Sequence, residues 1–214
     1  MCIRDRVYIA DYNHLGVPAC RILVPTMSEI YSADDLVDDN NNRSLDYRDD
    51  VLNLRNLSDK QCLSLYEKLE DSGLDDFMPL SELIGIVFAK DSGWHDYTIG
   101  ELKAALCLAV GELQEAKNMI EMFMSFAEKD ADIMNFYRCL DSLIDIELDA
   151  DLSFSDYENA LNKLYTPTTV TNALQVTRRE QKFFGLEDIN SSLSNLRTHQ
   201  ALVASFAKLR KKMQ

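Results

Sequence analysis

Pairs of adjacent aspartates are the residues of this chain that most directly suggest chemistry. Carboxylate oxygens bind Mg²⁺, which usually sits beside substrate phosphates held by other groups. The seven glycines are scattered, and no phosphate-binding loop of the GxxxxGKS/T or GxGxxG type occurs in the sequence. We therefore predict solvated surface carboxylates. The alternative is a carboxylate-based site within the helices, with Asp38 and Asp39 as its best candidates. The pairs are Asp34–Asp35, Asp38–Asp39, Asp49–Asp50 and Asp75–Asp76.

The three histidines give little support for catalysis. His14 falls in a turn, where a solvated side chain is favoured over contact with an active site at the edge of a larger domain. His95 follows Trp94 in a polar loop, which the indole ring is expected to anchor. His199 falls within a helix, where bonding to a neighbouring helix is favoured because no nucleophile pairs with it. HExxH and GxSxG motifs are absent from the sequence. We assign no catalytic, cofactor-binding or metal-ligating residue.

The five cysteines show no CxxC spacing. Three of them lie beside leucines in helical patterns, which favours buried free thiols over disulfides or a zinc site. Such thiols fit a reducing, cytoplasmic location. The cysteines are Cys2, Cys20, Cys62, Cys107 and Cys139.

The charge of the chain is strongly negative and unevenly placed. The net charge is −14, and residues 178–214 contain 8 Lys/Arg against 3 Asp/Glu. The remaining residues, 1–177, are strongly acidic. Their charge argues against a general nucleic-acid binder, because contact with phosphates needs clustered cations. The cations Arg210, Lys211 and Lys212 complement the dipole at the end of a predicted helix, which we favour over an RNA contact. No apolar run approaches the roughly 20 residues that span a bilayer, so we expect no membrane contact.

Two short strands are predicted at the start of the chain, within residues 7–31. Runs of β-branched and aromatic residues bounded by Gly16 and Pro25 are typical of strands. A lone two-stranded ribbon is at best marginally stable. We therefore expect the ribbon to be the end of a larger sheet, and the chain to be the C-terminal part of a longer protein.

The same segment resembles the YcaO family, in the group linked to methylthiolation of a small-subunit ribosomal protein. The likeness continues more loosely to the end of the chain, and it departs from the family pattern at Pro18 and Thr26. Residues 1–6 (MCIRDR) do not fit and are expected to be a non-native scar. The residues that carry the likeness are VYIADY (7–12), HLG (14–16), ACRILVP (19–25), MSEIY (27–31), IGELKAALCLAVGELQEA (99–116), FYRCL (136–140), FFGL (183–186) and HQALVASFAKL (199–209).

The resemblance implies a parent protein that uses ATP and magnesium to activate a backbone amide. The family's ATP and magnesium ligands lie upstream of this region, so the resemblance places no ligand within residues 7–214. It also implies a helical C-terminal module for dimerisation or partner contact. A homodimer is expected, with a radical methylthiotransferase and a ribosomal protein as further partners.

The rest of the chain is predicted to be helical, so the fold class is α+β and mostly α. We expect the terminal strands of a YcaO domain at 7–31, a linker and first helix at 32–57, and a helical domain at 58–214. The turn at residues 111–116 resembles that of a tetratricopeptide repeat, and a similar fragment recurs at 156–160, which indicates an antiparallel helical array without a clean tandem. The paired Phe183 and Phe184 are expected to fill the core rather than to form a partner-binding patch. The helices are predicted at 44–54, 58–72, 79–88, 98–110, 112–123, 131–148, 155–165, 169–184 and 190–212.

Local signals predict the starts and the apolar sides of several of these helices. Ser58 and Thr98 have the spacing of capping boxes with Gln61 and Glu101. Apolar residues at helical spacing are expected to face the core. They are Leu45, Val51, Leu52 and Leu54 in the first helix, Leu63, Tyr66 and Leu69 in the second, and Leu193, Leu196, Leu202, Val203, Phe206 and Leu209 in the last.

Two readings of function remain. The first is a non-catalytic C-terminal part of an ATP-using YcaO protein that serves dimerisation or partner binding. The second is a stand-alone helical scaffold with no enzymatic role.

Overall fold

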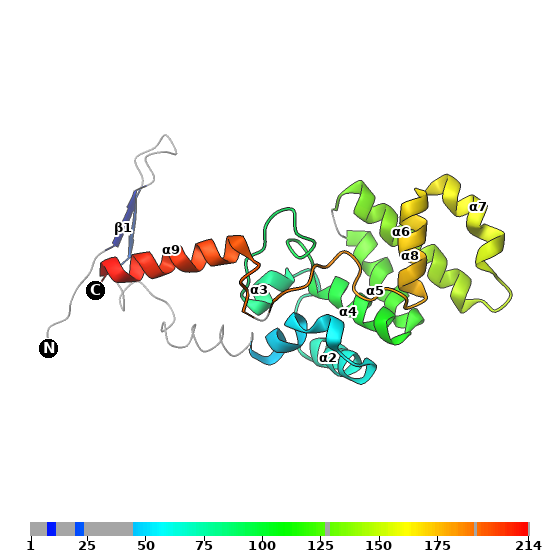
Figure 1. Ribbon diagram of the computed structural model, residues 1–214, viewed down its shortest axis with the longest axis horizontal. Helices are drawn as coiled ribbons and strands as arrows, with labels where there is room; N and C mark the ends of the chain where they lie inside the picture. The colour runs from blue at the N-terminus through cyan, green and yellow to red at the C-terminus, as the bar shows by residue number, and fades with distance from the viewer. Residues whose placement is uncertain (1–7, 12–19, 24–44, 127–128, 191, 214) are drawn as a thin grey trace. The chain divides into compact units, whose positions relative to one another are not determined.

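The computed structural model describes residues 8–11, 20–23, 45–126, 129–190 and 192–213. Contacts divide the chain into two units, residues 1–45 and 46–214, which are described separately. In the first unit, β1 (Tyr8–Asp11) pairs antiparallel with β2 (Cys20–Leu23), and Tyr8 lies opposite Leu23 (Figure 1). The predicted scar and linker, and His14, lie outside the described residues.

The second unit is helical, which confirms the mostly α class (Figure 1). Its described elements are a helix at 45–52, all but the first residue of which belongs to this unit, η2 (Leu54–Asn56), α2 (Asp59–Asp71), α3 (Leu80–Ile84), α4 (Ile99–Val110), α5 (Leu113–Phe126), α6 (Ala131–Leu148), α7 (Phe154–Leu164), α8 (Pro167–Thr177) and α9 (Arg197–Met213).

Local signals fix the ends of several helices. Ser58 and Thr98 each form a capping box with the residue three positions later, so that two early backbone N–H groups are satisfied at α2 and at α4. Gly111 takes a φ of 90° at the end of α4, a left-handed conformation that glycine adopts without steric cost. The chain then enters α5, whose fully buried Ala116 belongs to the packed core.

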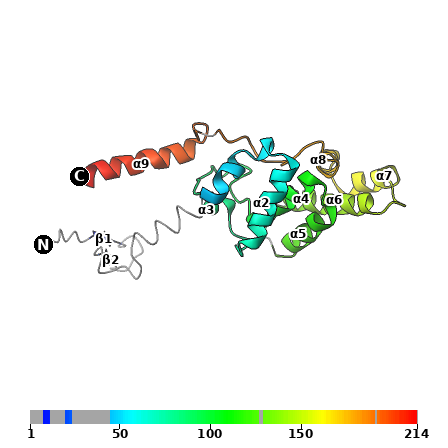
Figure 2. The same ribbon diagram turned by 90° about the horizontal axis from the view of Figure 1, so that it is seen from below.

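Two hydrophobic cores meet at α4. Leu102 and Leu106 belong to a core that includes α2, α3 and the helix at 45–52. Cys107 and Leu108 belong to a second core, which includes residues of α5, α6, α7 and α8. In both views α4 lies between α2 and α5 (Figures 1 and 2). The central position of α4 explains why ten of its twelve residues are buried.

Three predicted helix boundaries are wrong. The helix predicted at 79–88 ends at Ile84, because Gly85 turns into the left-handed region. The helix predicted at 169–184 ends at Thr177, and residues 178–190 and 192–196 are irregular; these two stretches are here called the strap. The last helix begins at Arg197 rather than at residue 190, because the strap continues through Leu193, which is buried in the first core with a φ of 55°.

Three predicted apolar faces also need correction. Leu45 is 69% exposed and Leu63 is 40% exposed, although both were placed on buried faces. In α2 the buried positions are Cys62, Leu65 and Leu69, one residue out of step with part of the predicted pattern. The predicted stripe of the last helix is exposed along α9. None of the described helices is long and apolar enough to cross a membrane.

Candidate functional site

Glu101 is the centre of the most elaborate polar cluster that the structure describes. It is the third residue of α4 and only 4% exposed. Its Oε2 accepts hydrogen bonds from Thr98 N (2.9 Å), Thr98 Oγ1 (3.0 Å) and Lys129 Nζ (3.0 Å), and its Oε1 accepts one from Tyr137 OH (3.0 Å). A carboxylate has about four acceptor sites. Four donors of the protein itself bond to Glu101, three of them to Oε2 and one to Oε1.

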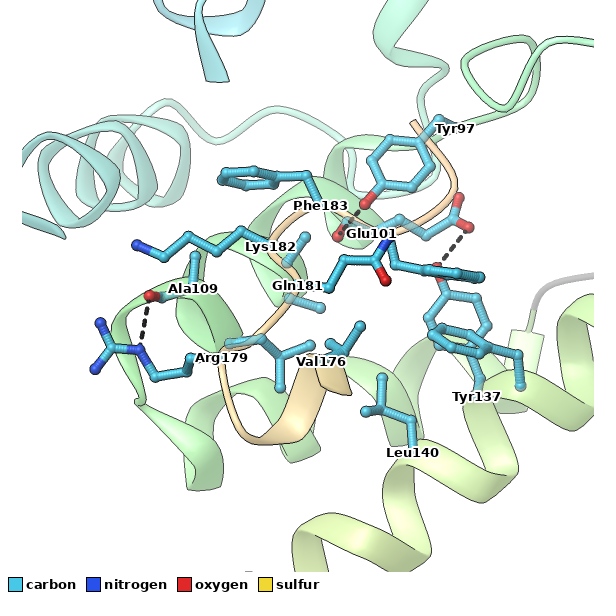
Figure 3. Close-up of a pocket in the computed structure, with 15 residues that line it drawn as sticks. Tyr97, Glu101, Ala109, Tyr137, Leu140, Val176, Arg179, Gln181, Lys182 and Phe183 are labelled. Atoms are coloured by element: carbon cyan, nitrogen blue, oxygen red, sulfur yellow. Dashed lines mark hydrogen bonds between the residues drawn. The ribbon is translucent and has the colours of Figure 1, made fainter. Parts of the chain in front are cut away.

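Two tyrosines line the same cluster and stay protonated. Tyr97 OH donates to the backbone oxygen of Glu101 at 3.1 Å (Figure 3). Burial, together with the charge of Glu101, raises the pKa of Tyr97 and of Tyr137 well above the usual value. Lys129 joins Glu101 to the backbone oxygen of Asp96 and so holds the loop before α4. The cluster thus connects α4, α6 and the polar loop at residues 90–97.

A groove of about 720 Å³ opens beside Glu101. Its lining includes Phe136, Tyr137 and Phe184, and the Phe136 and Phe184 rings stack with centroids 4.9 Å apart. The start of α8 contributes polar side chains, among them Thr169 and Asn172. We call this hollow the groove; it combines aromatic and hydrogen-bonding groups.

A much smaller cavity lies next to the groove, between α4, α6, α8 and the strap (Figure 3). Its volume is about 30 Å³, and it is lined by Leu140, Val176 and Phe183 among others. A space of that size holds about one water molecule. It therefore cannot take a nucleotide.

The strap is fastened to the helices by ion pairs. Arg179 and Lys182 both contact the carboxylate of Asp59 at the start of α2, with Lys182 Nζ at 2.7 Å from Oδ1. Hydrogen bonds from Lys182 and Arg179 lower the pKa of Asp59. Arg179 Nε also donates to Ala109 O at 3.1 Å, so the strap closes over the end of α4 (Figure 3).

The strap also holds the polar loop. Trp94 Nε1 donates to Glu187 O at 2.8 Å, while Ser92 Oγ and Gly93 N donate to the Glu187 carboxylate at 3.0 and 3.1 Å. Trp94 is 3% exposed and stacks on Phe88 with centroids 5.7 Å apart. The prediction that Trp94 anchors this loop is confirmed.

Two lysines join helices through paired carboxylates. Lys103 of α4, with a side chain 4% exposed, contacts Glu70 at 2.8 Å and Asp76 at 2.7 Å. Burial lowers the pKa of Lys103, but the hydrogen bonds to Asp76 and Glu70 outweigh it, and the net pKa is raised. The prediction that Asp76 is a solvated carboxylate is therefore wrong, because Asp76 is the partner of a buried cation.

The second of these lysines connects α5 to α6. Lys117 Nζ lies 2.6 Å from Asp141 and 3.1 Å from both Glu121 and Asp145. Burial opposes the charge of Lys117, yet the hydrogen bonds to its partners raise its pKa. In the first cluster one lysine contacts two carboxylates, and in the second one lysine contacts three, so each lysine joins neighbouring segments of the chain.

The candidate residues identified in the sequence do not lie together in one site. His199 Nδ1 accepts a hydrogen bond from Val87 N at 3.3 Å, whereas His95 lies on the polar loop, 3.6 Å from Asp96. Asp49 is exposed, and Asp38 and Asp39 lie outside the described residues. Within the described part of the chain, no cluster of three or more His, Cys, Asp or Glu side chains is arranged to hold a metal ion.

Three cysteines and the paired phenylalanines have the environments that were predicted from the sequence. Cys62, Cys107 and Cys139 are free and buried, which confirms that prediction. Phe183 is 3% exposed in the first core, and Phe184 packs against the second. Cys2 and the side chain of Cys20 lie outside the described residues.

Sequence reasoning missed three lysines that organise this region, Lys103, Lys117 and Lys129. Lys103 had a visible signal, because it interrupts the apolar helix LKAALCLAV after Leu102. A lysine in such a setting is rarely buried unless it is paired. Its partners Glu70 and Asp76 are distant in sequence, so the pairing itself had no local signal.

The fold and the helical sequence together match a known family. A family model described as the YcaO cyclodehydratase C-terminal domain matches residues 44–214. Because this match covers most of the chain, the chain belongs to that family, and the resemblance found in the sequence is confirmed.

Two curated proteins are similar over nearly the whole chain. The Ribosomal protein S12 methylthiotransferase accessory factor YcaO of Escherichia coli (strain K12) is 39% identical over 209 residues, which cover 96% of this chain and 36% of that protein. An uncharacterized protein of Haemophilus influenzae is 39% identical over 210 residues, again covering 96% of this chain and 36% of its own length. The chain thus spans about a third of the length of the curated relatives it matches.

Proposed function

We propose that the chain is the non-catalytic, protein-contact module of a YcaO protein. The whole protein would use ATP and magnesium to activate a backbone amide and would assist methylthiolation of a small-subunit ribosomal protein, in the cytoplasm. The family membership and the printed name of the Escherichia coli relative support this proposal. So does the polar architecture, because the carboxylate of Glu101 is bonded to four donors of the protein itself, which join α4 to α6 and to the preceding loop.

The observation that carries the proposal is the uncovered apolar side of α9. Four residues form it, here called the α9 stripe: Leu202, Val203, Phe206 and Leu209, which are 40%, 49%, 63% and 56% exposed. Every residue from 201 to 209 is exposed. A helix that presents such a stripe is suited to contact with another protein surface.

The helix pair α4–α5 supports a repeat-like module. Gly111 turns the chain at a φ of 90°, and the small Ala116 is fully buried in the second core. A glycine turn followed by a small residue lets two helices approach closely, as in tetratricopeptide repeats. We propose that the array at 58–214 has this character and that β1 and β2 are the terminal strands of a larger sheet.

The test uses the full 214-residue chain and three named contacts: itself, the S12 methylthiotransferase and ribosomal protein S12. We expect at least one contact, weakened tenfold or more by Phe206→Glu with Leu209→Glu, while circular dichroism stays unchanged. Leu164→Glu is the matched control, because Leu164 is 73% exposed on another helix. Magnesium-dependent ATP hydrolysis by the chain, or no binding to any of the three, would contradict the proposal.

A further inference from the structure

We propose that the groove binds an extended, positively charged segment of a partner protein, whose arginine or lysine side chains lie along the aromatic residues that line it. This inference rests on the proposed protein-contact function and adds a second contact site, together with the chemistry of the segment that the site takes. Its basis is that acidic, aromatic and hydrogen-bonding groups from different elements surround one hollow.

Negative charge dominates the border of the groove. Its lining contains five carboxylates and only two lysines, and one of these, Lys129, is already paired with Glu101 at 3.0 Å. Four of the carboxylates are exposed, and among the described residues only His95 lies within ion-pair distance of any of them. A cationic segment that enters the groove is therefore attracted by charges that the protein itself leaves available. The four carboxylates belong to Asp91, Asp96, Asp130 and Asp132.

The aromatic lining favours long basic side chains over a bare cation. Phe136 stacks on Phe184 with centroids 4.9 Å apart and meets the Tyr137 ring edge-on at 5.6 Å. Ile133, which is 42% exposed, extends this apolar surface next to Asp132. The carbon stems of Arg and Lys pack along apolar surface while their charged ends stay in water, and a guanidinium also stacks on aromatic rings. Aromatic rings beside exposed carboxylates therefore match both parts of a basic side chain.

Polar side chains at the start of α8 suit an extended backbone. Thr168 and Asn172 both line the groove. The asparagine amide offers two N–H donors and one carbonyl acceptor, and the threonine hydroxyl can donate and accept. An extended segment carries backbone N–H and C=O groups that need partners, whereas a helix has already paired its own. The groove is therefore better suited to an extended segment than to a helix.

The groove is shaped before any partner arrives. Lys129 bonds to Glu101 and to the backbone oxygen of Asp96, and Trp94 Nε1 donates to Glu187 O at 2.8 Å, so the polar loop is fixed to α4 and to the strap. A preformed site avoids much of the ordering cost of binding. Its volume of about 720 Å³ lies within the range of ligand pockets, which is enough for a few large side chains.

Fluorescence polarisation with three labelled peptides tests the charge requirement on the full chain. The peptides share Gly/Ser flanks and carry Arg-Leu-Arg-Leu-Arg, Gln-Leu-Gln-Leu-Gln or Glu-Leu-Glu-Leu-Glu at the centre. We expect the arginine peptide to bind about tenfold more tightly than the glutamine peptide, and the glutamate peptide not to bind. Raised salt should weaken binding of the arginine peptide, because the four carboxylates are exposed.

Paired substitutions locate the site on the molecule. Asp130→Asn with Asp132→Asn should weaken binding of the arginine peptide about fivefold, because two exposed charges are lost. Asp130 precedes α6 as its N-cap, a position that Asn also favours, so circular dichroism should be unchanged. The matched control is Asp149→Asn with Asp151→Asn, an exposed pair with the same spacing after the end of α6, which should change binding less than about twofold.

A neutral substitution tests the extended conformation of the segment. Asn172→Ala removes the amide from the start of α8 and leaves the charge of the chain unchanged. We expect about threefold weaker binding of the arginine peptide, because a hydrogen bond to its backbone is lost. Unchanged binding would contradict the contact between α8 and the peptide backbone.

Two outcomes would overturn the inference as a whole. If the two paired variants weaken binding equally, the net charge of −14 attracts the peptide and the groove does not. If the glutamine peptide binds as tightly as the arginine peptide, positive charge is not what the groove recognises.

The α9 stripe separates this inference from the proposed function. Phe206→Glu with Leu209→Glu leaves the groove intact, so the arginine peptide should bind this variant within about twofold of the natural chain. If the groove variants bind the peptide normally while the α9 variant loses the methylthiotransferase or ribosomal protein S12, the inference fails and the protein-contact function stands. If the chain binds none of its three proposed contacts but peptide binding depends on Asp130 and Asp132, the α9 contact fails and the groove site stands.

Discussion

The helices α4 and α9 both follow a helical repeat of apolar residues, yet their environments are opposite. Ten of the twelve residues of α4 are buried, whereas every residue from 201 to 209 of α9 is exposed. The difference lies in the neighbours, because α4 packs against α2 and α5 and contributes to both cores. An apolar stripe thus identifies the side of a helix that is suited to burial, but not the surface that will cover it.

Truncating one leucine in α4 should give the largest effect. We expect Leu106→Ala to lower the free energy of unfolding by about 3 kcal/mol, because the side chain is fully buried and leaves a cavity. Phe206→Ala in α9 should change it by less than about 0.5 kcal/mol. Urea unfolding followed by circular dichroism, at concentrations too low for self-association, measures both. Equal costs would mean that α9 packs against its own chain.

Removing the buried cation of α4 should give the second-largest loss of stability. We expect Lys103→Met to cost about 2 kcal/mol, below the range for a fully buried pair, because Glu70 is 49% exposed. Lys208→Met, on exposed α9, should cost almost nothing. The pKa of Lys103 is raised in the folded state, so its contribution is present below pH 10.5 and is lost as the pH rises through the folded pKa. A difference between variant and natural protein that persists unchanged above that range would contradict the assignment.

A buried thiol should make the stability depend on alkaline pH. Burial raises the pKa of Cys139 from 9.0 to about 11. The unfolded thiol therefore ionises first, and stability present below pH 9 is lost as the pH rises toward 11, by about 1.4 kcal/mol per pH unit at most. Thermal unfolding of Cys139→Ala between these values should show a flatter decline. If the stability of Cys139→Ala falls with pH as steeply as that of the natural protein, the thiol ionises equally in the folded and unfolded states.

The smallest effect should come from the helix caps. We expect Thr98→Ala to cost about 1 kcal/mol, because it frees an early backbone N–H and removes a donor from Glu101. Ser58→Ala, in an exposed capping box, should cost somewhat less. Urea unfolding of the two variants side by side measures the contribution of burial to the same motif. A larger cost at Ser58 would contradict this ordering.

Local signals in the sequence were sufficient for much of the fold. The capping boxes at Ser58 and Thr98 were predicted with their partners, and the bounds of α6 match the predicted 131–148. These features depend on residues within a few positions of one another. The helical class, the family and the buried thiols could be predicted from the sequence for the same reason.

Features set by distant residues were not predictable in this way. The sequence from 178 to 184 is compatible with a helix, but the chain leaves α8 after Thr177 so that Arg179 and Lys182 can reach Asp59. Glu101 was recognised as a cap, yet its hydrogen bonds to Lys129 and Tyr137 join segments about 30 residues away. The groove likewise depends on α6, α8 and the polar loop meeting in space.

The close crossing at Gly93 bears on the order in which the molecule folds. A Cβ added there would lie 2.0 Å from Gly185 O, and the adjoining bond from Trp94 to Glu187 links residues 93 positions apart. Closing so long a loop is entropically costly, whereas α4 and α5 meet across a single turn. We therefore expect the helices α4 and α5 to pair before the strap packs against the polar loop. Trp94 is the sole tryptophan, so its fluorescence in stopped-flow refolding should report that last step after the far-ultraviolet signal has already risen.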